Sequence, residues 1–309
     1  MARTQSHDFG DGTYAVTSGS NIGVIAPGDR ALMVDAGLDR DAARKALREL
    51  EPLGAALAGV LITHGHADHF GGAAWTARRQ GVPVMAPPLA GAYAHLPLLE
   101  PIFLHGGAAP ISELRSKFTL ARDALATMPA TMAPGVLAVA GIEVQVEALP
   151  GHAPAQVGIG YPAASAPAPK GRTLFCGDAV FPQETMARHP ILFCYDVDAW
   201  LATLVRLPKL AYDRVVPGHG APVEDVRPLV SATAARLREI VSVVREAIVD
   251  PRTPGEVLRA VAEHFEVTFT APQFLLLSQT TVNAALTSLQ TAGEAEAVVA
   301  ENRLVWQGR

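Results

Sequence analysis

Three histidines and one aspartate fall within six consecutive positions of the segment LITHGHADHFGG, residues 61–72. They are His64, His66, Asp68 and His69, and they directly follow an apolar run. Neutral imidazoles and carboxylates without thiolates suit Zn²⁺, and they also suit iron and manganese. In an extended turn His64 and His66 point the same way, whereas Asp68 and His69 begin the next helix and can face a second point. The spacing therefore predicts two adjacent divalent metal ions, with zinc the first choice.

Three further polar residues each follow an apolar run: His152 in PGHAPAQ, Asp178 in CGDAVF and His219 in PGHGAP. Because strand ends in a layered sheet meet at one edge, where α/β proteins bind ligands, we expect these side chains to converge. Asp178 would bridge the two ions through its two carboxylate oxygens. The other predicted ligands are His64, His66 and His152 at the first ion, and Asp68, His69 and His219 at the second.

The remaining polar residues of these types are expected to serve the fold. Asp35, in VDAG, is interpreted as a turn residue or as a hydrogen-bonding support for a ligand rather than as a ligand. Cys176 alternates with Asp178 along a strand and is predicted to point into the core. For the four isolated histidines an ordinary hydrogen-bonded role is expected; they are His7, His95, His105 and His264.

The elements that must position these residues are short apolar strands alternating with helices. The insertion at 93–135 mixes proline, glycine and short helical pieces, which is typical of a lid or pocket wall, although an ordinary surface excursion fits nearly as well. The segment 163–171 is predicted to be a flexible hairpin loop. Strands are expected in 12–17, 21–27, 30–37, 57–63, 82–87, 136–150, 156–162, 173–181 and 214–220, and helices in 39–50, 71–81 and 198–207.

Beyond about residue 225 the glycines thin out and helices are predicted at 228–250, 253–265 and 278–293, followed by a hairpin at 297–307. Three helices and a hairpin are the outline of a winged helix. The chain is therefore divided into a domain at 1–227 and a helical, winged-helix-like domain at 228–309. The candidate recognition helix carries no lysine or arginine, so this domain is interpreted as an interface or stability module rather than a nucleic-acid binder.

The motif HGHADHFGG matches the H-x-H-x-D-H signature of the metallo-β-lactamase superfamily, and PGHAP, CGDAVF and PGHG resemble its later motifs in the same order. The resemblance covers about residues 12–225. It implies an α+β fold, a four-layer αβ/βα sandwich with the metals at one edge. Members with these ligands include glyoxalase II, acyl-homoserine lactonases, ribonuclease Z and persulfide dioxygenases. The helical tail resembles the winged-helix appendage of some hydrolases of the superfamily.

The function predicted from these residues is a metal-dependent hydrolase in which a hydroxide between two metal ions cleaves an ester-type bond, a thioester or a lactone. Asp178 would orient the hydroxide and Asp68 would accept its proton. An ester is preferred because the protein is acidic and no Ser/Lys/Arg cluster marks a phosphate site. Three residues after Asp178 overlook the site and are candidates for substrate contact, although surface or packing roles are the simpler interpretation; they are Tyr195, Glu184 and His189.

Two alternatives stay open. A mononuclear iron enzyme of the persulfide-dioxygenase type would use His64, His66 or His152, and Asp178 alone. A ribonuclease or another nucleic-acid-binding protein would explain the winged-helix outline, but the missing basic stripe argues against it.

The composition limits the remaining possibilities. A net charge of −5 over 309 residues gives no general attraction to nucleic acid or anionic lipid. The two cysteines, Cys176 and Cys194, form no disulfide framework, the first residues lack the pattern of a secretory signal, and prolines interrupt the uncharged stretch 80–99. We therefore expect a cytoplasmic protein with a small-molecule substrate and no nucleic-acid or membrane partner, and leave a homodimer open.

Overall fold

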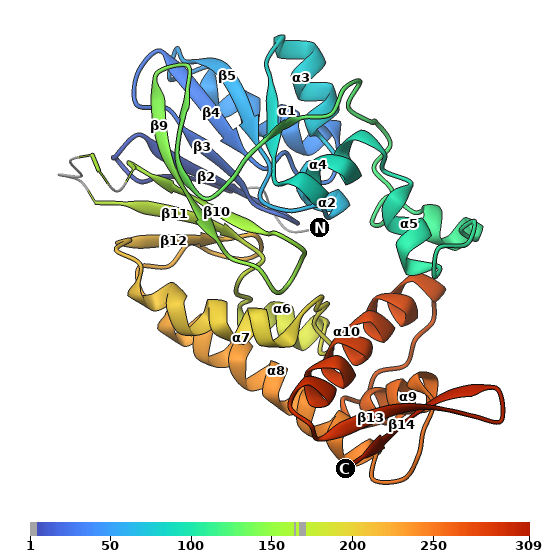
Figure 1. Cartoon of the computed structure of the whole chain (residues 1–309). Helices are drawn as coiled ribbons and strands as arrows, with labels where there is room; N and C mark the ends of the chain where they lie inside the picture. Colours follow the sequence, from blue (N-terminus) through green and yellow to red (C-terminus); the bar gives the residue numbers. More distant parts are fainter. Residues whose placement is uncertain (1–4, 164, 167–170) are drawn as a thin grey trace.

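The computed structural model describes residues 5–163, 165–166 and 171–309. Two β-sheets lie face to face, and helices cover the outer face of each (Figure 1). Three clusters of buried apolar side chains separate the four layers: one between the sheets, one between the first sheet and its helices, and one between the second sheet and its helices. The predicted α+β sandwich with four layers is therefore present.

The first sheet has seven strands in sequential order, antiparallel from β1 to β4 and parallel from β4 to β7. The helix α1 (Arg40–Leu50) on its outer face begins where predicted, since the Asp39 carboxylate accepts hydrogen bonds from the backbone of residues 41 and 42. The helix α3 (Ala73–Gln80) ends at Gly81, whose φ of 68° suits the left-handed C-cap. The strands are β1 (Gln5–Asp8), β2 (Thr13–Thr17), β3 (Ile22–Ile25), β4 (Arg30–Val34), β5 (Ala56–Leu61), β6 (Val84–Ala86) and β7 (Ala130–Thr131).

The second sheet has the order β12-β11-β10-β9-β8 and is antiparallel except for the β11–β12 pair. Its strands are β8 (Gly135–Val139), β9 (Ile142–Ala148), β10 (Val157–Tyr161), β11 (Thr173–Gly177) and β12 (Arg214–Pro217). The outer face of this sheet packs against α7 (Val197–Arg206) and α8 (Arg227–Ala247), and α6 (Gln183–Arg188) and the short 3₁₀ helix η2 (Leu207–Lys209) lie beside them. The predicted loop at 163–171 lies largely outside the described residues.

The segment 93–135 begins in the last turn of α4 (Pro88–His95) and includes the edge strand β7 near its end. Between them lie two short helices, α5 (Leu99–Leu104) and the 3₁₀ helix η1 (Ser112–Arg115). Both α5 and η1 contact the helix α10 (Pro272–Thr291), so this segment connects the first half of the chain with its C-terminal part (Figure 1). Its role as a lid stays a prediction.

After α8 the chain forms α9 (Pro254–His264), α10 and the hairpin of β13 (Ala295–Ala300) and β14 (Arg303–Gly308). The predicted capping box is present, because Thr253 and Glu256 exchange side-chain and backbone hydrogen bonds. The hairpin turns at residues 301–302, as predicted. The third helix begins at Pro272, six residues before the predicted start, because Pro272 occupies its first turn and the apolar run after it continues the helix.

The C-terminal part shares one hydrophobic core with the second sheet. Buried side chains of β11, α7, α8, α9 and α10 belong to a single cluster that includes Cys176, Trp200, Leu237 and Leu286. Cys176 therefore lies in the core, as predicted. The boundary at residue 227 stays a prediction. No helix among the described residues has both the length and the apolar character needed to cross a bilayer.

Candidate metal centre

The seven predicted ligands come together at one edge of the sandwich. His64 and His66 lie in the loop after β5, and Asp68 and His69 lie in the one-turn helix α2 (Ala67–Phe70) that follows. The other three follow β9, β11 and β12; they are His152, Asp178 and His219. Possible ligand atoms within 4.8 Å of one another form two groups, of which one contains His64, His66, His152 and Asp178 and the other Asp68, His69 and His219.

The first group consists of ring nitrogens that face each other. His66 Nδ1 lies 3.1 Å from His64 Nε2 and 3.0 Å from His152 Nε2. The opposite nitrogens are already engaged: His152 Nδ1 donates to the carbonyl of Phe193, and His64 Nδ1 donates to Thr63 Oγ1. The Nε2 atoms of these two neutral rings therefore carry lone pairs. A single proton on His66 Nδ1 can point squarely at only one of these two lone pairs, whereas a metal ion among the three nitrogens would accept from all of them, so this arrangement fits a metal ion.

In the second group, too, the Nδ1 atoms of the histidines donate to other residues and the Nε2 atoms face the ligand group. His69 Nδ1 donates to Asp35 Oδ2 at 2.8 Å, and His219 Nδ1 donates to the carbonyl of Gly19 at 2.7 Å. Their Nε2 atoms face Asp68 Oδ2 at 3.7 and 3.4 Å. Each Nε2 must therefore share this space with a proton or a metal ion, because a neutral ring would turn its lone pair toward a carboxylate.

Asp178 lies between the two groups. Its Oδ1 is 3.4 Å from His69 Nε2, and its Oδ2 is 3.4 Å from His152 Nε2 and 3.3 Å from His219 Nε2. Asp178 Oδ1 and His69 Nε2 are both buried and have no hydrogen-bond partner among the described residues. A buried polar atom without a partner is costly, so these orphaned atoms also fit cations held by both groups.

The ionisation of the first group favours metal binding. Burial disfavours the charged imidazolium and lowers the pKa of His66 to about 4 and that of His152 to about 3. Burial also holds the pKa of His64 well below its ordinary value. These rings are therefore neutral near pH 7, and no proton has to leave before a metal binds.

The second group depends on its carboxylates. Burial opposes a charge on His219, but Asp178 and Asp68 outweigh it and raise its pKa to about 9. The pKa of His69 is raised well above its ordinary value in the same way, since Asp178, Asp68 and Asp35 outweigh its burial. Burial would raise the pKa of Asp178, but His219 and His69 hold it well below its ordinary value. In this acidic environment a metal ion would displace protons from both histidines.

A family model for the Metallo-beta-lactamase superfamily matches residues 16–219, more than half of the chain. The chain belongs to this superfamily. It is therefore an enzyme of a superfamily of hydrolases, and residues 64–69, 152, 178 and 219 all lie within the matched range. A search of curated proteins found no significant match.

Solved structures of metallo-beta-lactamase superfamily proteins share this fold. A beta-lactamase domain protein from Burkholderia ambifaria has a TM-score of 0.73 at 18% identity, covering 99% of this chain and 94% of its own. A metallo-beta-lactamase family protein from Thermus thermophilus has a TM-score of 0.71 at 20% identity, covering 96% and 99%. The metallo-beta-lactamase SMB-1 bound to 2-mercaptoethanesulfonate has a TM-score of 0.57 at 16% identity, covering 77% and 96%. The first two alignments extend over the C-terminal helices and hairpin.

Asp35 supports the second group from outside, as the sequence suggested. It adopts a left-handed backbone conformation with φ of 59° directly after β4. Its Oδ1 accepts a hydrogen bond from the backbone N–H of Thr63, and its Oδ2 accepts from Thr63 Oγ1 and His69 Nδ1, all at 2.8 Å. Because Thr63 Oγ1 in turn accepts from His64, one buried carboxylate orients a histidine of each group. Thr63 was missed by the sequence analysis, since a threonine that ends a strand carries no distinguishing signal.

Gly218, in the PGHG motif, is required by the close approach of Asp178. A Cβ atom at this position would lie 2.0 Å from Asp178 Oδ1 and 2.8 Å from His69 Cε1. Neither neighbour can move without disturbing both ligand groups. A steric reason therefore requires glycine at this position of the motif, and the neighbouring residues in the sequence do not reveal it.

The C-terminal part supports the first group through α10. Thr281 Oγ1 accepts a hydrogen bond from the backbone N–H of Cys194 at 3.1 Å and donates to the carbonyl of Leu192 at 2.8 Å. Between these two residues lies Phe193, whose carbonyl accepts from His152 Nδ1. Helix α10 thus holds the loop that orients His152. This link between residues far apart in the chain had no sequence signal.

The three candidates for substrate contact lie at different places. Tyr195 is exposed, and its backbone N–H donates to the carbonyls of Gly151 and His152, so it borders the first group. His189 directly follows α6 and is largely exposed, and its pKa is lowered by partial burial of the ring and by the charges of Arg188 and His219. Glu184 is exposed on α6, and among the described residues its side chain forms no hydrogen bond or ion pair with either group. Their contact with a substrate stays a prediction.

Proposed function

We propose that the protein is a dinuclear metallo-hydrolase that cleaves an ester-type bond of a small molecule, a thioester or a lactone. The observation that carries the proposal is the position of Asp178, with one carboxylate oxygen toward His69 and the other toward His152 and His219. A carboxylate that faces both groups can bridge two cations and set their spacing. The proposed ligands are the seven predicted ones, and zinc is the proposed metal, with iron or manganese as alternatives.

Two divalent ions, when bound, would lower the pKa of a water molecule and polarise the oxygen of the scissile carbonyl. The chain's own residues would position the water molecule and accept its proton. Asp178, buried between the groups, would hold the nucleophilic water in place through hydrogen bonding. Asp68, whose side chain is 30% exposed, lies at the open side and would accept the proton released during attack.

The side chains of the two ligand groups favour an ester substrate over a phosphodiester. Neither group contains a lysine or an arginine, the side chains that commonly bind a phosphodiester beside metal ions. The C-terminal part has the helix and hairpin order of a winged helix, and we propose that it acts as a support, through Thr281, rather than as a nucleic-acid reader. Helix α10 contains no lysine or arginine over its length.

Metal quantification on the full-length protein tests the proposal, followed by a screen with thioester, lactone and phosphodiester substrates. We expect about two ions per chain and turnover of one of the two ester classes. The matched variant is His69→Ala, which should lose mainly one ion while the first group keeps the other. A wild-type protein with one iron ion that His69→Ala retains, together with oxygen consumption, would instead indicate a mononuclear iron enzyme.

A further inference from the structure

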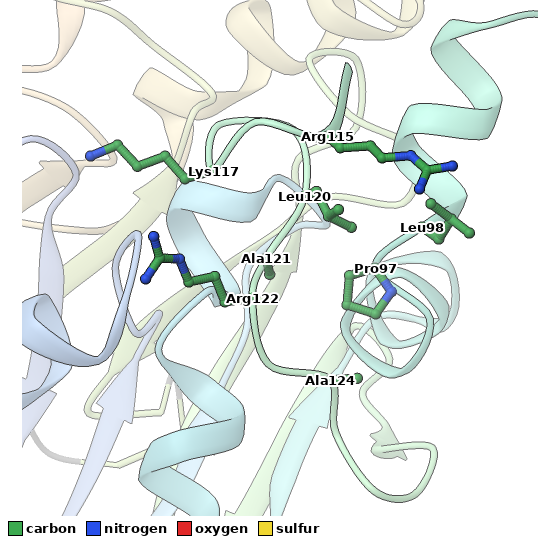
Figure 2. A pocket seen from close by; sticks show the side chains of 8 residues that line it. All are labelled: Pro97, Leu98, Arg115, Lys117, Leu120, Ala121, Arg122 and Ala124. Atoms are coloured by element: carbon green, nitrogen blue, oxygen red, sulfur yellow. The ribbon is translucent and has the colours of Figure 1, made fainter. Parts of the chain in front are cut away.

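A hollow of about 530 Å³ lies in the segment 97–124 (Figure 2). Its wall combines apolar side chains with three cationic ones, Arg115, Lys117 and Arg122, all of them exposed. In Figure 2 Lys117 and Arg122 extend to one side of the loop, whereas Arg115 extends toward Leu98. The apolar part of the wall consists of Pro97, Leu98, Leu120, Ala121 and Ala124.

The cations of the hollow are not neutralised within the described part of the chain. Arg115 and Arg122 form no hydrogen bond or ion pair there, and Lys117 only lies over the ring of Phe118, 5.2 Å from its centroid. The neighbouring Asp123 pairs with Arg78 on α3 at 3.4 Å. Three like charges within eight residues of a protein with a net charge of −5 repel one another, and a bound anion would relieve this repulsion.

The segment that contains the hollow exposes several large apolar side chains. Seven of the large apolar side chains that are exposed lie within residues 89–128, and they include Leu98, Phe103 and Phe118. Their full set is Leu89, Leu96, Leu98, Phe103, Ile111, Phe118 and Met128. Leu98 belongs to the wall of the hollow, where apolar side chains and cations together match a ligand that has both an apolar body and a negative charge.

The hollow belongs to the segment that packs on the metal-binding loop. A Cβ atom at Gly65, between His64 and His66, would lie 2.4 Å from the ring of Tyr93, so the start of this segment lies directly against the loop. The backbone N–H of Leu125 donates to the carbonyl of Ala94 at 2.9 Å. Ala121, in the wall of the hollow, shares a core cluster with Phe70 of α2.

We propose that this hollow binds the anionic group of an amphiphilic substrate, a phosphate or carboxylate joined to an apolar body that carries the scissile thioester or ester. The inference rests on the proposed hydrolase function for the reaction, but the binding itself does not require turnover. The proposal departs from one expectation from the sequence, which was that no Ser/Lys/Arg cluster marks a phosphate site. The signal was present in RSKFTLAR, residues 115–122, but an exposed loop with three cations looks like an ordinary solvated surface.

Calorimetric titration of the full-length, metal-loaded protein tests this proposal. The probes are decyl phosphate and decanoate below their micelle concentrations, with inorganic phosphate as the anion without a chain and decyl glucoside as the chain without a charge. At least one of the two amphiphilic anions should bind about tenfold more tightly than both single-feature probes, and comparing the two distinguishes a phosphate from a carboxylate. Inorganic phosphate or decyl glucoside binding as tightly as both amphiphilic anions would overturn the proposal.

Substitutions in the wall of the hollow test where the amphiphilic anion binds. Lys117→Gln and Arg122→Gln, at the two side chains that extend to the same side of the loop, should each weaken binding of the amphiphilic anion about fivefold, near the most that an exposed ion pair contributes, and Arg115→Gln should weaken it less. Arg122→Lys keeps the charge and should retain most of the affinity. The matched control is Arg79→Gln, an exposed cation on α3 outside the hollow, which should leave binding unchanged. Equal affinity of the wild type and the triple glutamine variant would overturn the proposal, since the anion would then bind elsewhere, including at the metal ions.

A kinetic comparison distinguishes this inference from the proposed function. Two thioesters with the same acyl group, one with a phosphorylated thiol such as coenzyme A and one with uncharged N-acetylcysteamine, should differ in KM more than in kcat. The triple glutamine variant should remove this difference. If neither thioester reacts while decyl phosphate still binds through the three cations, the choice of ester is wrong and the anion site stands. A single-stranded RNA oligonucleotide that binds more tightly than decyl phosphate and depends on the same cations would overturn the proposal, because the hollow would then bind nucleic acid rather than an amphiphilic anion.

Discussion

Replacing Asp35 by asparagine should weaken metal binding without touching any proposed ligand. Asp35 Oδ1 accepts a hydrogen bond from the Thr63 backbone, and Oδ2 accepts from the Thr63 hydroxyl and from His69 Nδ1. Asparagine has one carbonyl oxygen and one NH₂ group, which cannot accept. The backbone is not disturbed, because asparagine tolerates the left-handed conformation that Asp35 adopts, with φ of 59°. The substitution therefore changes the charge and the acceptors alone.

The magnitude follows from these three contacts. If the NH₂ group replaces Oδ1, it faces the backbone N–H of Thr63, and if it replaces Oδ2, it faces both the N–H of His69 and the O–H of Thr63. In either orientation at least one buried donor loses its acceptor, which costs about 1–3 kcal/mol of stability for each donor. The loss of the negative charge behind His69 should also weaken the second metal site about 10- to 100-fold, the usual effect of removing such a supporting carboxylate.

The assay is chelator competition for zinc combined with urea unfolding of the metal-free protein. The matched control is Asp11→Asn, because the side chain of Asp11 is only 2% exposed and accepts hydrogen bonds from the backbone of Thr13, from Thr173 and from Arg214, far from the metal centre. This control should lose similar stability and keep its zinc affinity. The reasoning fails if Asp35→Asn binds both zinc ions as tightly as the wild type, or if Asp11→Asn loses zinc to the same extent.

Three further predictions concern the centre and its supports. Asp178→Asn should lose metal from at least one group and cost about 2.7–4 kcal/mol of transition-state stabilisation, with little change in KM. The control Cys176→Ser should keep both metals. Metal content and kcat of the two variants test this, and the reverse pattern would refute it. Gly218→Ala should lose metal because its Cβ would overlap Asp178, whereas Gly255→Ala, with no atom within 4 Å, should keep it, as measured by metal content after dialysis. Thr281→Val removes two buried hydrogen bonds and should lower stability by about 2 kcal/mol and weaken the first metal site; unchanged zinc affinity would show that α10 does not position His152.

The amino-acid sequence by itself determined most of the long strands and helices and the ligand candidates, but not short elements such as β1, α6 and β7. Strand ends and helix caps depend on neighbouring residues, so Asp39 and Gly81 could be assigned from local pattern alone. The spacing of His64, His66, Asp68 and His69 predicted two groups, because an extended turn and the helix that follows it direct side chains in definite directions. The structure brings the same seven residues together in two groups. The start of α10 was misjudged because an apolar run after a proline is compatible with several conformations.

Only the tertiary structure decided what surrounds these residues. Asp35 and Thr63 are 28 positions apart, and Thr281 lies 87 positions from Cys194, yet each pair is hydrogen-bonded. Gly218 is required because Asp178, from a different strand, approaches it. The three cations of the hollow lie beside Pro97 and Leu98 only because the folded chain brings residues 97–98 next to residues 115–124. The spacing of residues in the sequence indicates which chemistry a site can perform. The hydrogen bonds, close approaches and cavities around the site form between segments that are far apart in the sequence, so that spacing does not reveal them.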